Sequence, residues 1–265
     1  MSLASELTTR SAAIYAEFLI PHLTADARLI DIGCGSGSIA LGLAEVAGHV
    51  TGVDPDPGAV AEANAYVAEH QIGNATFRTG SAYSLALPDS QFDAAICHSV
   101  LEALDRPLDA LREIERILKP GGVLGVASVE YGGLILAGPG EPLLRRFYWM
   151  RERLWELVGS HPCRGRALRG LLIAAGFEHV AATSTYFCHG TQDQVRSFGN
   201  DRAQECRDGW EASAALEHGL ASRDELQAMA DAWMEWSESA QAYAAFAWCR
   251  ALGWKARSDS RSSRR

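Results

Sequence analysis

Three glycines and one carboxylate stand close together near the start of the chain. Gly33, Gly35 and Gly37 follow Asp31 within the stretch LIDIGCGSGSIALGLA. The apolar run before the glycines predicts a strand, and the run after them predicts a helix. Glycines in such a turn let a ligand approach the backbone closely, and the free N–H groups at a helix start attract negative groups. The spacing therefore predicts a nucleotide-binding turn.

Two acidic residues restrict which nucleotide this turn can hold. A dinucleotide fingerprint, G-x-G-x-x-G, needs glycine where Ser38 stands, and here the third glycine comes one residue early. Asp31 would repel a pyrophosphate, but it suits a ligand that carries an ammonium group and no phosphate. Asp54 ends the next predicted strand, about 20 residues past the loop, where a carboxylate accepts hydrogen bonds from ribose hydroxyls.

Strands and helices alternate around these residues. Apolar strand candidates without a polar alternation predict a parallel sheet that is covered on both faces. The strand candidates are ARLIDIG, HVTGVD, ATFRTG, FDAAICHS and GGVLGVAS, and the helices between them are SIALGLAEVA, PGAVAEANAYVAEHQ and PLDALREIERIL. We expect an N-terminal helix within residues 1–24 and a cofactor-binding core over 25–140.

The second half of the chain changes character. The stretches 141–165 and 189–240 predict helices, and Ser222 with Glu225 forms a capping box at the start of one of them. Between these stretches, GRALRGLLIAAGFEHVAATSTYF predicts a helix that ends at Gly176 and then a strand. YAAFAWCRALGWK predicts the last strand. We therefore expect one domain over 1–265 with a helical insertion.

Composition limits the possible partners. The chain of 265 residues has a formal net charge of −9, which argues against binding of nucleic acid through phosphate contacts. The basic, serine-rich end over 255–265 predicts a disordered tail. The six cysteines form no C-x-x-C pair, so we expect neither a metal site nor disulfides. No leader or long apolar run is present, and we expect a cytoplasmic protein without membrane contact.

Four motifs in order resemble those of the class I S-adenosylmethionine-dependent methyltransferases, and most of all the small-molecule branch typified by ubiquinone and menaquinone biosynthesis enzymes. The motifs are LIDIGCGSG, VTGVDPDP, LPDSQFDAAICHSVLEAL and ALREIERILKPGG. The resemblance covers residues 25–130 and weakens beyond them. It implies an α/β fold: a Rossmann-like, doubly wound, mostly parallel seven-stranded sheet with helices on both faces and a helical lid insertion before the last strand.

The resemblance also implies roles for individual residues. Gly33, Gly35 and Gly37 would pass close to the methionine part and the ribose of S-adenosyl-L-methionine, and Asp31 would act through the loop on the amino group. Asp54 would bind the ribose hydroxyls.

On the adenine side, Pro55 would flank the ring. Ser81 stands where many members have an aspartate, so adenine binding would depend on the Ala82 backbone and apolar contacts.

Two further residues are candidates near the sulfonium. His98, at the end of the fourth strand, would either contact the methionine part or act as a general base. Tyr15, on the N-terminal helix, would either contact the cofactor or pack in the core. Ala103 departs from relatives that carry a histidine there. Tyr131 would face the acceptor, whereas His161, His189 and His218 are expected at the surface or as helix caps.

The acceptor is expected in the two helical stretches, which are rich in aromatic residues. We expect these stretches to form a lid around a small, hydrophobic or aromatic metabolite that is methylated on O, C or N. The aromatic residues are Phe147, Tyr148, Trp149, Trp155, Trp210, Trp233 and Trp236. Two alternatives stay open: a protein that binds S-adenosylmethionine without transferring methyl, and an NAD(P)-dependent reductase. The oligomeric state stays open too.

Overall fold

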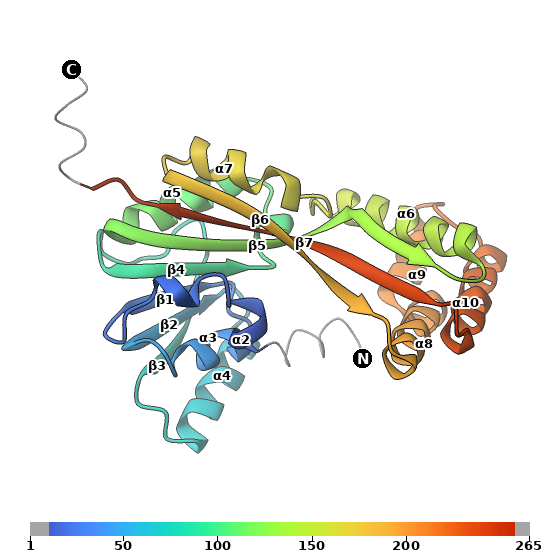
Figure 1. The fold of residues 1–265 in the computed structure, drawn as a ribbon, viewed down its shortest axis with the longest axis horizontal. Helices are drawn as coiled ribbons and strands as arrows, with labels where there is room; N and C mark the ends of the chain where they lie inside the picture. The colour runs from blue at the N-terminus through green and yellow to red at the C-terminus, as the bar shows by residue number, and fades with distance from the viewer. Residues whose placement is uncertain (1–10, 258–265) are drawn as a thin grey trace. The chain divides into compact units, whose positions relative to one another are not determined.

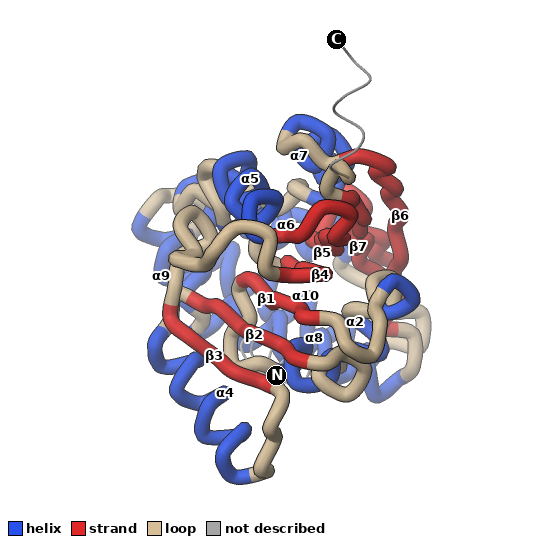
Figure 2. The backbone as a smooth tube through the Cα atoms, turned by 90° about the vertical axis from the view of Figure 1, so that its left-hand side faces the viewer, coloured by secondary structure: helices blue, strands red, loops and turns tan. Residues whose placement is uncertain are grey.

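A single seven-stranded sheet runs through the residues that the computed structural model describes, 11–257. Its strand order is β3-β2-β1-β4-β5-β7-β6, and Figure 2 shows the first five strands side by side. The strands are β1 Arg28–Ile32, β2 His49–Asp54, β3 Ala75–Thr79, β4 Phe92–His98, β5 Leu118–Ala137, β6 Glu178–His189 and β7 Tyr243–Trp254.

The sheet is mostly parallel. β1 pairs in parallel with β2 and β4, β2 with β3, and β4 with β5. β7 lies between β5 and β6 and runs opposite to both (Figure 1). The predicted fold class, a Rossmann-like mostly parallel sheet of seven strands, is confirmed.

The predicted single domain is built from two compact units. The core unit holds the described part of Leu3–Ser128, together with Gly165–Thr183 and the described part of Cys249–Arg265. The helical unit holds Val129–Arg164 and Ser184–Trp248. The predicted helical insertions 141–165 and 189–240 fall almost wholly within the helical unit.

The helices follow the same division. Those of the core unit are α2 Ala12–Tyr15, α3 Ser38–Leu43, α4 Pro57–Glu69, α5 Pro107–Ile117 and α7 Leu168–Ala174. Those of the helical unit are α6 Glu141–Leu157, α8 Gln192–Asp208, α9 Trp210–Glu217 and α10 Arg223–Glu238. They gather around the parts of β5, β6 and β7 that belong to this unit (Figure 1). Short 3-10 turns cover Ile20–His22, Leu101–Ala103 and Gly165–Ala167.

The predicted N-terminal helix is shorter than expected in its described part. Only Ala12–Tyr15 is α-helical, and a 3-10 turn at Ile20–His22 follows, with Pro21 inside it. Residues 1–10 lie outside the described residues. Of the predicted tail 255–265, residues 258–265 also lie outside them.

Alternation along the strands distributes the core side chains over two faces of the sheet. In β1, Leu29 packs with α2, α3 and α4, whereas Ile30 and Ile32 pack with α5 and α7. In β4, Ala94 and Ile96 join the first group. Because successive side chains point to opposite faces, the residues two positions beyond Leu29 and Ile96 face α2, α3 and α4 at the carboxyl ends of their strands. Those residues are the candidate site residues Asp31 and His98.

β5 is much longer than the eight residues GGVLGVAS that predicted it, since it runs from Leu118 to Ala137. Consecutive glycines, Gly132 and Gly133, argue against a strand on sequence grounds. In the structure β7 approaches this part of β5 so closely that a Cβ on Gly133 would lie 2.6 Å from the Cβ of Ala247. The glycine is therefore a close-approach position inside a strand, which sequence alone does not reveal.

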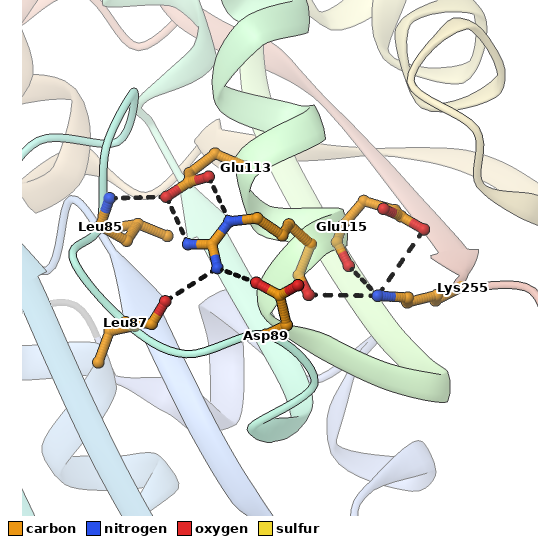
Figure 3. A network of polar contacts seen from close by, with 7 residues as sticks. Leu85, Leu87, Asp89, Glu113, Glu115 and Lys255 are labelled. Carbon is orange, nitrogen blue, oxygen red and sulfur yellow. Dashed lines mark hydrogen bonds and ion pairs between the residues drawn. The ribbon is translucent and has the colours of Figure 1, made fainter.

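A polar network fixes the loop between β3 and β4 to the end of α5 (Figure 3). The Arg116 guanidinium donates to Glu113, to Asp89 and to the Leu87 carbonyl, while Glu113 also accepts from the Leu85 N–H.

At the end of α5, Lys255 Nζ donates to the carbonyls of Glu115 and Arg116, which satisfies acceptors that the helix leaves open. Lys255 is the first residue of the predicted tail, so the ordered chain extends beyond that predicted boundary.

We predict that Arg116→Met lowers the free energy of unfolding by ~1–3 kcal/mol, because it removes several charged hydrogen bonds and leaves Glu113 without its partner. Arg112→Met on the same helix is the matched control, because Arg112 is exposed and meets Asp109 only at 3.5 Å; its effect should stay within about 0.5 kcal/mol. Chemical denaturation of both variants measures the difference. Equal effects would show that the network does not hold the loop.

Candidate functional site

The glycine turn after β1 needs its glycines for backbone geometry. Gly33, Gly35 and Gly37 all have positive φ, at 73°, 53° and 87°, a region that other residues avoid. The N–H of Gly33 donates to the Val53 carbonyl at 2.7 Å. A Cβ on Gly33 would lie 2.2 Å from the Val100 side chain, whereas a Cβ on Gly35 would meet nothing within 4 Å. Gly33 thus serves packing, and Gly35 leaves its backbone open to an approaching group.

Asp54 joins this turn to the end of β2. Its Oδ2 accepts from the Gly35 N–H at 2.8 Å, and its Oδ1 accepts from the Asp56 N–H at 2.9 Å. Each carboxylate oxygen can accept a second hydrogen bond. Asp54, although only 9% exposed, therefore shapes the turn and retains capacity to accept further hydrogen bonds.

Asp31 places a second carboxyl group beneath the same turn. It is 2% exposed, and burial, with the nearby Asp54 charge as a second cause, raises the pKa of Asp31 to about 7. A buried carboxyl that is reluctant to ionise is stabilised as an anion by a nearby cation. The chemistry of this edge therefore favours a positively charged ligand over a phosphate.

The structure brings His98 and Tyr15 together, as two residues from elements far apart in the sequence. Their ring centroids lie 5.3 Å apart in an edge-to-face arrangement. His98 ends β4 and is buried.

The adenine-side candidates stand at the neighbouring strand ends. The Gly80 N–H donates to the Asp54 carbonyl at 3.0 Å, so the turn that holds Ser81 begins beside the end of β2. Ser81 is exposed and its hydroxyl accepts from the Tyr83 N–H, Ala82 packs against the core, and Pro55 is exposed. All the predicted cofactor-binding residues lie in the core unit.

Sequence reasoning missed one buried acid at this edge. Glu102 follows β4 and accepts from the hydroxyls of Ser99, at 2.9 Å, and of Ser128, at 2.7 Å. Ser128 is on β5, so Glu102 ties the end of β4 to β5. The available signal was a charged residue inside the apolar run VLEAL directly after a strand.

The helical unit encloses most of the aromatic residues that were expected to line a lid. Phe147, Tyr148, Trp233 and Trp236 are buried. Two expectations were wrong, because Trp149 and Trp210 are 45% and 51% exposed and line no interior. Tyr131 is buried among Tyr148, Trp155 and Phe246.

His189 differs from the expected surface or capping histidine. It is half-buried and stacks on Phe198 with 4.1 Å between ring centroids. Burial, and secondarily the charge of Arg202, lowers the pKa of His189 to about 4, so its ring is neutral at pH 7. His161 is exposed and His218 is the C-cap of α9, both as expected.

Buried charges accompany the aromatic residues, and sequence reasoning missed them. Arg151 pairs with Glu205 at 3.3 Å and with Glu211 at 3.2 Å, and Arg202 pairs with Glu205 at 2.9 Å. A signal was present: Arg151 stands at helical spacing between Phe147 and Leu154, on the apolar stripe of its helix.

The cleft in the core unit, the acidic and metal-ligating side chains, and the helix lengths do not identify a ligand. The cleft of about 810 Å³ over α3 and α4 shares Ser36 and Ser38 with the glycine turn but includes neither Asp54 nor His98. Within residues 11–257, no three His, Cys, Asp or Glu side chains gather as a metal site, and no helix is long and apolar enough to cross a membrane.

The fold is a Rossmann-like sheet, the kind of sheet in which ligands bind at the carboxyl ends of the strands. Residues 30–126 match the family described as "Methyltransferase domain". Over these residues the resemblance to methyltransferases that the motifs predicted is confirmed. The match lies inside the core unit and does not reach the helical unit.

Relatives agree with this assignment. The chain is 27% identical over 245 residues to an uncharacterized methyltransferase of Schizosaccharomyces pombe, covering 88% of this chain and 86% of that protein. It is 34% identical over 96 residues to a ubiquinone biosynthesis O-methyltransferase of Alkalilimnicola ehrlichii, covering 36% and 38% of the two chains.

Two solved structures resemble most of the chain. The YcgJ protein from Bacillus subtilis has a TM-score of 0.61 at 19% identity, covering 91% of this chain and 97% of that one. The [4+2]-cyclase SpnF has a TM-score of 0.53 at 26% identity, covering 91% and 80%.

We predict that Gly33→Ala destabilises the protein by ~2–4 kcal/mol, because the new Cβ meets Val100 and the backbone keeps a left-handed φ. Thermal and chemical denaturation measure the loss. Gly73→Ala is the control, because its Cβ would meet nothing within 4 Å. Adding Val100→Ala to Gly33→Ala should recover part of the loss; no recovery would contradict the steric explanation.

Proposed function

We propose that the chain is an S-adenosylmethionine-dependent methyltransferase that transfers a methyl group to O, C or N of a small, hydrophobic or aromatic metabolite. The observation that carries the proposal is the pair of carboxyl groups at the glycine turn. Asp54 accepts from the Gly35 N–H and retains acceptor capacity, and Asp31 lies buried beneath with a raised pKa. These two acids, one of them a hydrogen-bond acceptor with capacity to spare, fit a ligand with ribose hydroxyls and positive charge.

Each residue at the glycine turn is proposed to bind a different group of S-adenosylmethionine. Asp54 is proposed to accept hydrogen bonds from the ribose hydroxyls, and the open side of Gly35 lets the ligand approach the backbone. Asp31 is proposed to stabilise the amino group through the turn.

The adenine end has fewer polar groups. Pro55, Ser81 and Ala82 are proposed to flank the adenine, with Ser81 as the polar contact. His98 and Tyr15, which touch each other, are proposed to border the methionine part.

When bound, S-adenosylmethionine supplies a reactive methyl group on a positively charged sulfur, so the protein's main work is to position the two reactants and exclude water. A general base is required only if the acceptor must lose a proton. His98 is the proposed base for such an acceptor. As a neutral imidazole it could take the proton, whereas an imidazolium would be repelled by the sulfonium.

A second candidate function follows from the similarity to the [4+2]-cyclase SpnF, which covers most of both chains. A protein that binds S-adenosylmethionine in the same turn without transferring methyl shares every cofactor contact named above. Formation of S-adenosylhomocysteine from S-adenosylmethionine with phenolic and carboxylic acceptors separates this candidate from the transferase.

We predict that the protein binds S-adenosylmethionine in calorimetric titration and that Asp54→Ala weakens binding by ~1–3 kcal/mol, about 5- to 150-fold, because ribose hydroxyls lose a charged acceptor. Asp56→Ala is the control, because the Asp56 side chain accepts from the Gly58 N–H at the start of α4 and has no proposed cofactor contact. NADH is titrated in parallel. Unchanged affinity in Asp54→Ala, or tighter binding of NADH, would contradict the proposal.

We also predict that affinity for S-adenosylmethionine rises with pH up to about pH 7 and then levels off. In the free protein the raised pKa leaves Asp31 protonated below pH 7, and the cation favours the ionised form, so binding there must release a proton. The slope is bounded by about one proton, or tenfold per pH unit. Calorimetry at several pH values measures it.

Asp31→Asn is the control for this pH dependence, because an amide cannot titrate. Comparison of the two proteins also removes any titration of the ligand itself. Identical pH profiles in both would show that Asp31 does not interact with the ligand's charge.

A further inference from the structure

We propose that the interior of the helical unit binds a small aromatic anion, a ring that carries an ionised carboxylate or phenolate, on Arg151, Arg202 and Tyr148. Assigning this anion as the methyl acceptor rests on the proposed function. The binding itself does not.

The first argument is a surplus of hydrogen-bond donors. Among residues 11–257, the Tyr148 hydroxyl and the Nε atoms of Arg151 and Arg202 are buried and have no acceptor. The buried indole N–H groups of Trp155 and Trp233 also have none within the described chain. Buried polar groups are normally paired, and an unpaired one carries the desolvation cost of the group. A ligand rich in acceptors would satisfy several of these donors at once.

The second argument is that these donors surround one place. Phe246, on β7, contacts the rings of Tyr148 at 5.6 Å, Phe198 at 5.4 Å and His189 at 6.0 Å. The guanidinium of Arg202 lies over the Phe198 ring at 4.9 Å, and that of Arg151 lies 5.7 Å from the Trp155 ring. The donors therefore come from α6, α8 and α10 toward one aromatic interior.

The third argument is charge. The two guanidinium groups face the carboxyl groups of Glu205 and Glu211, and burial raises the pKa of Glu211, which disfavours its ionised form. Positive charge reaches the aromatic side of the interior, where it contributes to the lowered pKa of His189. Tyr131 and Tyr148 stay protonated at neutral pH, because burial raises the pKa of both. The interior therefore combines unpaired buried donors with two guanidinium groups, and an anion would interact favourably with both.

The aromatic side chains of this interior favour a ligand whose uncharged part is a flat ring. Rings stack edge to face or offset on one another, and guanidinium groups bind flat on ring faces. A flat ring with one ionised oxygen group matches both the walls and the donors. Because the anchoring side chains are all buried, the ligand reaches them only when the helical unit opens locally.

The test compares 3,4-dihydroxybenzoate with catechol, which has the same diol ring without the carboxylate. Binding to the full chain is measured by quenching of tryptophan fluorescence and by calorimetry, without S-adenosylmethionine. We expect the benzoate to bind with a Kd of about 1 mM or tighter and at least ~10-fold more tightly than catechol. Equal binding of the two, or no binding of the benzoate at millimolar concentration, overturns the proposal.

Two variants locate the site. Tyr148→Phe removes a hydroxyl that has no partner in the described chain, so it should leave thermal stability unchanged or raised while it weakens benzoate binding several-fold. Tyr186→Phe, an exposed tyrosine on β6, is the matched control and should change neither. Arg202→Met should abolish the preference for the carboxylate.

If Arg202→Met does not fold, Tyr148→Phe decides alone. Unaltered benzoate binding in Tyr148→Phe, or a loss of stability without a loss of binding, shows a structural role and overturns the proposal. These titrations contain no cofactor, so their result does not depend on whether the protein binds S-adenosylmethionine. The anion site and the proposed function are therefore tested separately.

Discussion

The hydrogen bond from the Gly35 N–H to Asp54 connects the turn after β1 to the end of β2, its neighbour in the sheet. It determines where the glycine turn lies, because Gly35 has a left-handed φ and its N–H must find an acceptor away from any strand ladder. The same carboxylate accepts from the Asp56 N–H and so shapes the start of α4. The turn, the second strand and its following helix are thus built around one side chain.

Around that side chain the core unit gathers acids, and the helical unit gathers arginines and tyrosines inside an aromatic interior. A buried carboxyl with a raised pKa, Asp31, gains most from a cationic ligand, whereas unpaired donors such as the Tyr148 hydroxyl gain most from an anionic one. A methyl donor that carries a cation and an acceptor that carries an anion would each find the unit whose charge complements its own. Selectivity for each reactant can then arise from charge as well as from shape.

Much of the core unit followed from the sequence, because local patterns determine it. Apolar runs and glycine spacing indicated the first four strands and the turn, and the acid at the end of β2 was found from its distance to the loop. The length of β5 did not follow, because Gly133 is required by the approach of Ala247, a contact between residues more than a hundred positions apart. In the described residues the N-terminal helix ends at Tyr15, although the apolar spacing that predicted it continues to Phe18 and Leu19.

The buried charges were the other failure. Arg151 was not singled out in the sequence, yet it is buried and occupies the apolar stripe beside Phe147. Only tertiary partners, here Glu205 and Glu211, decide whether an arginine at such a position points inward. Glu102 was passed over for the same reason, since its two hydroxyl partners come from different segments. Whether a polar side chain is buried depends on partners far away in the sequence, and the spacing of apolar residues does not reveal those partners.

Between residues 11 and 257 the chain passes from one unit to the other four times, and three of those crossings fall inside strands β5, β6 and β7. An insertion of one residue at such a crossing would turn every later side chain of that strand to the opposite face. The helical unit is therefore not joined to the core unit by flexible linkers that would let one relative's helical unit replace another's. New acceptor specificity in such a protein is expected to arise by substitution within the interior, with the strand lengths preserved.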